Sequence, residues 1–108
     1  MKIWIPTIGD HVRLTENWSF LIKADWRNMS MLNLIQSTPV VVGGGSRSMT
    51  LPAGTVLKIE RVYIRSSFRE FDSVTFRVRA SPDRRFEKCR FFAALSDVNK
   101  MEAEPLEP

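Results

Sequence analysis

Two consecutive segments that both read as strands, joined by a polar turn, constrain the fold of this chain more than any other feature. They occupy residues 51–79. In the second segment Val74, Phe76 and Val78 alternate with polar residues, and Arg77 is one of these. Such a period of two is typical of a strand with one buried face. The sequence therefore predicts an antiparallel pair with an apolar face and a basic face.

The first strand of this pair changes the parity of its apolar positions. Leu57 and Ile59 set one alternation, and Val62 and Ile64 resume it one position out of step. One extra residue in a ladder produces such a change, so we predict a β-bulge at Glu60–Arg61. The residues that this bulge leaves on the outer face are Lys58, Tyr63 and Arg65.

Other alternating or β-branched segments, bounded by turn residues, predict further short strands. The expected strands are residues 11–15, 18–22, 40–42, 57–64, 74–79 and 86–95. Glu16–Asn17 is either a tight turn or an irregular point in one long strand. Phe91 and Phe92 are adjacent, which indicates either burial on both faces of the last strand or an exposed aromatic ring.

Two segments do not follow the strand pattern. Residues 25–35 fit a short helix with Asp25 as N-cap, although a loop followed by a strand at Leu32–Ile35 competes with it. Gly43–Ser46 lacks the Gly-Lys-Ser/Thr ending of a phosphate-binding loop, so we interpret it as a hairpin tip. Ser96–Asp97 predicts a helix N-cap or a turn.

Five or six short strands with at most one short helix are typical of an antiparallel small barrel or a sandwich. A length of 108 residues favours the barrel and one domain. We therefore predict a mainly β fold, with a single β domain at residues 1–104 and a frayed acidic tail at 105–108.

Apolar runs and cysteine content indicate the cellular compartment. The longest apolar runs are far shorter than the roughly 20 residues of a membrane span, and the first ten residues lack the apolar region of a secretory signal. Cys89 is the single cysteine, which excludes an internal disulfide. These features predict a cytoplasmic protein without membrane contact.

Positive charge is concentrated in one part of the chain. Residues 58–90 contain ten Lys or Arg and five Asp or Glu, a net charge of +5, whereas the whole chain carries +4. Arginine outnumbers lysine eleven to five, and guanidinium groups suit bidentate contacts with phosphate or carboxylate. This distribution favours an anionic partner, although half-exposed strands also need long polar side chains on their solvent face.

Residue types that carry catalysis are sparse. The single histidine, His11, lies beside Asp10 at a turn and is expected to face solvent, which is weak support for a catalytic triad. One histidine and one cysteine lack metal-ligand spacing, and Cys89 is expected in the core, with a reactive thiol as the alternative. We therefore predict no enzyme activity, no metal and no cofactor.

Three stretches carry a resemblance. GDHVRLTENWSF, LPAGTVLKIERVYIR and FDSVTF contain a Gly-Asp turn, a Pro-x-Gly turn and an Asp-Ser turn, each leading into a strand. They resemble parts of uncharacterised small Src-homology-3-like β-barrel proteins of bacteria and their phages. The resemblance covers about half of the chain, and it implies a fold and a genomic setting with no catalytic residue to carry over.

These observations favour a non-enzymatic binding module that contacts nucleic acid through an arginine-rich sheet face with interleaved aromatic rings. The residues expected to contact the partner are Arg61, Tyr63, Arg65, Arg77, Arg79, Arg84, Arg85 and Arg90. An acidic protein surface is the competing partner, in an inhibitor of a host enzyme or defence system encoded by a phage or mobile element. An edge strand such as Val40–Val42 offers a route to a homodimer.

Overall fold

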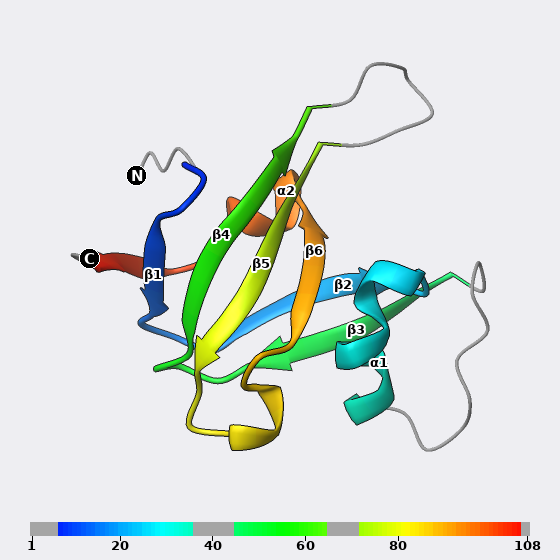
Figure 1. The fold of residues 1–108 in the computed structure, drawn as a ribbon, viewed down its shortest axis with the longest axis horizontal. Coiled ribbons are helices and arrows are strands. Elements are labelled where there is room, and N and C mark those ends of the chain that lie inside the picture. The colour runs from blue at the N-terminus through cyan, green and yellow to red at the C-terminus, as the bar shows by residue number, and fades with distance from the viewer. Residues whose placement is uncertain (1–6, 36–44, 65–71, 107–108) are drawn as a thin grey trace.

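A computed structural model of the chain describes residues 7–35, 45–64 and 72–106. The described residues form seven strands, one short helix and three single helical turns (Figure 1). The strands are β1 (His11–Leu14), β2 (Trp18–Lys23), β3 (Ser46–Leu51), β4 (Val56–Tyr63), β5 (Ser73–Ala80), β6 (Arg90–Ala94) and β7 (Ala103–Leu106). The helical segments are η1 (Trp26–Asn28), α1 (Met29–Ile35), η2 (Arg84–Phe86) and α2 (Leu95–Val98).

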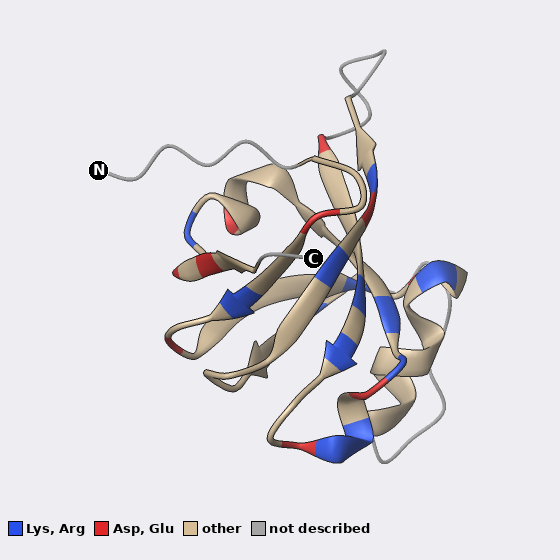
Figure 2. Ribbon diagram, turned by 60° about the vertical axis from the view of Figure 1, so that its left-hand side comes forward, with Lys and Arg blue, Asp and Glu red and all other residues tan. Residues whose placement is uncertain are grey.

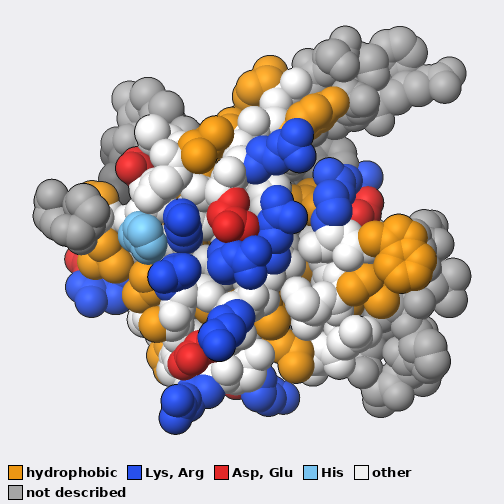
Figure 3. All heavy atoms as spheres, in the orientation of Figure 1, with side chains coloured by type: hydrophobic (Ala, Val, Ile, Leu, Met, Phe, Trp, Pro, Cys, Tyr) orange, Lys and Arg blue, Asp and Glu red, His pale blue; other side chains and the backbone are white. Residues whose placement is uncertain are grey.

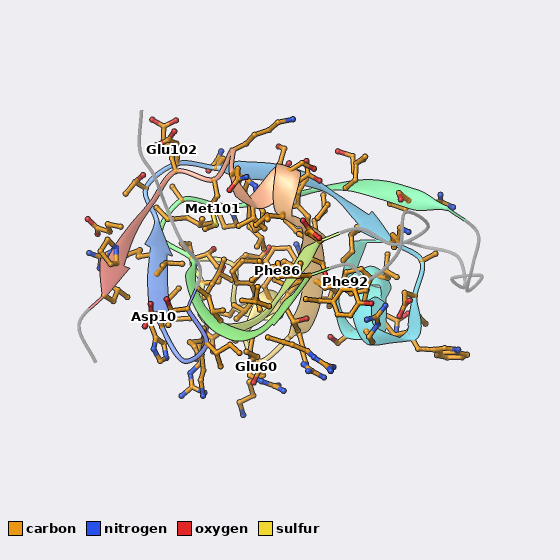
Figure 4. The ribbon with its side chains drawn as sticks, turned by 90° about the horizontal axis from the view of Figure 1, so that it is seen from above. Asp10, Glu60, Phe86, Phe92, Met101 and Glu102 are labelled. Carbon is orange, nitrogen blue, oxygen red and sulfur yellow. The ribbon has the colours of Figure 1, made fainter. Side chains whose placement is uncertain are left out.

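The strands form two antiparallel sheets. Five strands follow the order β6-β5-β4-β1-β7, and β2 pairs with β3 in a second sheet. The core lies between the two sheets (Figure 4), where Phe76 and Phe91 of the larger sheet pack against Trp18 and Phe20 of β2. The predicted mainly β class is confirmed. The described strands do not close into a barrel, because no ladder joins the two sheets.

The bulge predicted in β4 is present. Ile59 pairs with Phe76 and Arg61 pairs with Thr75, so Glu60 is the extra residue. A second shift lies between Val56 and Leu57, which pair with Ala80 and Val78, so Arg79 is extra on β5. Ile64 was expected on the apolar face, but it is exposed because β4 ends at Tyr63.

The ambiguous segment at 25–35 is helical, and its competing interpretation as a loop plus strand is wrong. Asp25 caps η1 by accepting a hydrogen bond from the backbone N–H of Arg27 at 2.9 Å. The chain continues directly into α1, which packs against β6. The Arg27 guanidinium also holds the pKa of the Asp25 carboxyl below its usual range through side-chain hydrogen bonds.

Strand β6 is shorter than the predicted strand at 86–95, because η2 and a left-handed residue, Lys88, precede it. Phe91 and Phe92 are both buried, so β6 is buried on both faces at these two residues and neither aromatic ring is exposed. Phe91 lies in the core, whereas Phe92 is covered by the guanidinium of Arg27, whose Cζ is 4.3 Å from the ring centroid. The segment η1–α1 therefore covers the outer side of β6.

Two polar side chains of this segment satisfy the backbone of β6 at the edge of the larger sheet. Asn28 is completely buried, and its Oδ1 accepts a hydrogen bond from Phe92 N at 2.9 Å. Its Nδ2 donates to Lys23 O at 3.0 Å, which ties the same side chain to β2. Ser30 Oγ accepts from Arg90 N at 3.3 Å. Side chains thus replace a further strand at this edge.

The C-terminal prediction needs correction. Residues from 105 onward were expected to be frayed, but Pro105 and Leu106 belong to β7 and pair with Val12 and His11 of β1. Ser96 lies inside α2 and does not cap it, because the N-cap position is Ala94. The expected strand at Val40–Val42, and with it the proposed dimer edge, lies outside the described residues. The first two residues of the expected hairpin tip at Gly43–Ser46 lie outside them as well, and Ser46 begins β3.

The backbone of Lys88 offers a test of local strain, because its φ of 69° lies in the left-handed region that disfavours side chains. The free energy of unfolding of Lys88→Gly is expected to be about 1 kcal/mol higher than that of Lys88→Ala. This order reverses the usual preference for alanine over glycine, and both variants lose the same exposed side chain. Urea denaturation of the two variants gives the difference, and an alanine variant as stable as the glycine variant would contradict the strain.

Candidate nucleic-acid interface

Strand register brings four basic side chains into one line across the larger sheet. His11 of β1 lies opposite Lys58 of β4, Lys58 lies opposite Arg77 of β5, and Arg77 lies opposite Arg90 of β6. Residues directly opposite each other in antiparallel strands share a face. We call these four residues the basic row. With neighbouring strands about 4.8 Å apart, the row extends over about 14 Å.

The figures show this concentration of charge. Lys and Arg lie on neighbouring strands in Figure 2. In the space-filling view they gather around one acidic side chain in the middle of the face, with the histidine at one side (Figure 3). Figure 4 labels Glu60, and side chains that end in nitrogen lie beside it on the outside of the sheet.

Glu60 is held between two members of the basic row. Its Oε2 accepts a hydrogen bond from Arg77 Nε at 3.2 Å, and its Oε1 lies 3.0 Å from Arg90 Nε. Oε1 is buried and receives no well-directed hydrogen bond from the described residues, so its contact with Arg90 is an ion pair of imperfect geometry. The carboxylate therefore offsets part of the charge of two arginines that were expected to contact the partner.

Arg61 and Arg79 were also expected on this face, and both are exposed. Arg61 follows the bulge residue of β4, and Arg79 is itself the extra residue of β5. Neither forms an ion pair with another described residue. Together with Lys58, they contribute positive charge that no neighbouring carboxylate neutralises within the described ranges.

Arg84 and Arg85 lie apart from the basic row, in the η2 turn beyond the end of β5. Arg85 Nη2 contacts Asp83 Oδ2 at 2.7 Å, and Arg84 Nε lies 3.7 Å from Glu87 Oε1. The hydrogen bonds from Arg85 hold the pKa of the Asp83 carboxyl below its usual range. The structure thus assigns both arginines to local ion pairs of the turn. Arg65 lies outside the described residues.

Of the aromatic rings interleaved with these arginines, Tyr63 is exposed at the end of β4, with 38% of its surface accessible. This exposure agrees with the predicted bulge. Phe92 is buried beneath Arg27 and is therefore not available to stack on a base. Phe68 lies outside the described residues.

Strand order places His11 beside Lys58, a contact that the sequence did not predict. The alternation around Val12 and Leu14 already indicated that His11 points away from the core. What the sequence lacked was the pairing of β1 with β4, which joins residues 47 positions apart. Glu60 was recognised as a bulge residue, but its two arginine partners depend on the same long-range register.

The remaining reactive groups give little support to other chemistry. Cys89 is buried, and burial raises the pKa of its thiol, which disfavours a reactive thiolate. Across residues 7–35, 45–64 and 72–106, no three His, Cys, Asp or Glu side chains gather closely enough to hold a metal ion. In those same ranges, no helix is long and apolar enough to cross a membrane.

Comparisons of this chain with protein-family models, with curated proteins and with solved structures found no match.

Proposed function

We propose that this chain is a non-enzymatic binding module of bacterial or phage origin, and that it contacts nucleic acid through the outer face of its larger sheet. The observation that carries the proposal is the basic row, in which four side chains lie in register across four strands. Arg61 and Arg79 extend this positive surface. Phosphate contacts of this kind supply most of the affinity for nucleic acid without regard to sequence.

Electrostatics supports an anionic partner. Lys58, Arg77 and Arg90 are like charges placed directly opposite each other, an arrangement that destabilises a sheet unless the charges are offset. Glu60 contributes one negative charge against these three positive charges. A bound polyanion would offset the remainder, so the same repulsion that costs stability in the free protein favours binding.

A single strand suits the face better than a duplex, because the exposed ring of Tyr63 can stack on an unpaired base. Stacking on one ring with arginine contacts to the backbone predicts little dependence on base sequence. An acidic protein surface would use the charged face without Tyr63, so the two partners differ in what this ring contributes.

One observation favours the second candidate, a protein-binding inhibitor of a host enzyme or defence system. Trp26 of η1 has 73% of its surface exposed, and tryptophan is enriched at the centres of protein interfaces. A pull-down from host lysate with and without nuclease separates the candidates. A protein partner that survives nuclease treatment would favour the inhibitor.

The Src-homology-3-like assignment and the cytoplasmic location belong to the same proposal. The turns at Gly9–Asp10 and at Pro52–Gly54, each of which precedes a strand of the larger sheet, support the fold assignment. The single buried cysteine supports a reducing compartment.

Fluorescence anisotropy with a labelled single-stranded oligothymidylate tests the nucleic-acid function. The logarithm of the association constant is expected to fall linearly with the logarithm of salt concentration, by about 0.7 for each phosphate contacted. Three or four contacts from the basic row would give a slope of about −2 to −3. The matching duplex serves as the comparison, and absence of binding to either probe at low salt would remove nucleic acid as the partner.

A further inference from the structure

Arg77 and Arg90 each contact the Glu60 carboxylate through Nε. The Nε of Arg77 and the Nε of Arg90 face the carboxylate, one at each oxygen. Arg77 is fixed at a second point, since its Nη1 donates to Lys88 O at 3.1 Å. The Nη2 of Arg77 and both Nη atoms of Arg90 have no hydrogen-bond partner among the described residues. These donor groups remain for a ligand.

The position of Glu60 explains why the carboxylate can hold two arginines. As the extra residue of the β4 bulge, it stands between the levels of Ile59 and Arg61 in the ladder with β5. Its side chain is only 23% exposed, whereas those of Arg77 and Arg90 are 38% and 46% exposed. The carboxylate is thus more deeply placed than the guanidinium groups that it orients.

We infer that Glu60 is a positioning residue, which orients Arg77 and Arg90 so that their outer N–H groups, with Lys58 beside them, form a binding site for one phosphate group. The inference rests on the proposed function and specifies where a phosphate of the nucleic-acid backbone is held. A free phosphate and a phosphodiester share the chemistry that this site recognises.

Phosphate fits the site because planar guanidinium groups donate in a fixed fork that matches its oxygens. Two arginines that are already oriented lose less side-chain freedom on binding than two mobile ones. Lys58 lies directly opposite Arg77 and supplies a third positive charge on the same face. The negative charge of Glu60 is already offset by its two ion pairs, so the site keeps a net positive charge.

Positioning and net charge predict opposite changes in affinity when Glu60 is replaced by glutamine. Glu60→Gln adds one unit of positive charge to the face, so net charge alone predicts tighter binding of single-stranded oligothymidylate. Loss of the ion pairs releases both arginines, so positioning predicts weaker binding, by about fivefold. Glu104→Gln is the matched control, because Glu104 forms its ion pair with exposed Arg13 of β1. This substitution removes the same negative charge without changing the contacts of Arg77 or Arg90.

Anisotropy at fixed salt is expected to show weaker binding for Glu60→Gln and unchanged or slightly tighter binding for Glu104→Gln. Equal tightening of binding in both variants would overturn the inference and make Glu60 a simple counter-ion.

Should Glu60→Gln fail to fold, Arg77→Lys keeps the charge but loses the two-point attachment to Glu60 and Lys88. Its binding should weaken about fivefold while Arg47→Lys, at an exposed position on β3 outside the larger sheet, leaves binding unchanged. Equal effects of these two variants would also overturn the inference.

Inorganic phosphate separates this inference from the function on which it rests. Addition of phosphate to the whole protein is expected to shift the Nε–H resonances of Arg77 and Arg90 in the NMR spectrum and to leave that of Arg79 unchanged. Shifts with phosphate but no binding of either oligonucleotide would retain the phosphate site and reject nucleic acid. Oligonucleotide binding with equal shifts at all three arginines would retain nucleic-acid binding and reject the site.

Discussion

Replacement of Asn28 by alanine is expected to lower the free energy of unfolding by about 2 to 4 kcal/mol. The side chain is completely buried and joins Lys23 O of β2 to Phe92 N of β6. Alanine removes both hydrogen bonds and leaves the buried N–H of Phe92 without this acceptor, whereas Lys23 O still accepts from Asp25 N at 2.9 Å. An unsatisfied buried group costs about 1 to 3 kcal/mol, and the loss of the other hydrogen bond costs about 1 kcal/mol.

The effect should be specific to this asparagine. Asn33→Ala is the matched control, because Asn33 lies on the exposed side of α1. Alanine is the better helix former at that position, so the control is expected to be neutral or slightly stabilising. Guanidinium chloride denaturation of both variants gives the comparison. If Asn28→Ala cost no more than the control, the bridge between β2 and β6 would contribute nothing to stability.

The same bridge connects the fold to the candidate interface. Strand β6 ends the larger sheet, and it carries Arg90, the last member of the basic row. Side chains of η1 and α1 satisfy the backbone N–H groups of Arg90 and Phe92 on the side away from β5. This edge therefore cannot pair with another strand.

Features that depend on neighbouring residues could be predicted from the sequence. The bulge at Glu60 follows from a change in apolar parity within one strand, and the N-cap at Asp25 follows from residues directly after it. The burial of both Phe91 and Phe92 was one of two alternatives. What decided between them was the helical segment packed over β6, a contact between residues about 64 positions apart.

Features that depend on strand order could not be predicted in this way. No local pattern indicates that β1 lies between β4 and β7, because that order requires Pro105 and Leu106 to return beside the first strand. Without it, His11 was not assigned to the charged face. Arg84 and Arg85 were expected to contact the partner because they are close in sequence to the arginines of β5. In the structure they lie in η2, where Arg85 forms an ion pair with Asp83 and Arg84 forms one with Glu87.

Replacement of Lys58 and Arg90 by glutamine is expected to weaken binding of single-stranded oligothymidylate about 100-fold. The two side chains lie on either side of Arg77 in the basic row. Each charge-assisted contact contributes about 1.5 kcal/mol or more, and two of them correspond to a factor of about 100. The salt dependence should also become shallower by about 1.4, because two phosphate contacts are lost.

The control must remove the same charges from elsewhere on the molecule. Arg47 on β3 and Lys100 beyond α2 are both exposed and lie outside the larger sheet. The variant with glutamine at these two positions has the same net charge as the Lys58 and Arg90 variant. If affinity follows net charge alone, the two variants weaken binding equally and the basic row is not the interface. If the row is the interface, the control changes affinity only slightly and keeps the salt slope of the unmodified protein, because long-range attraction is screened over about 10 Å at 0.1 M salt.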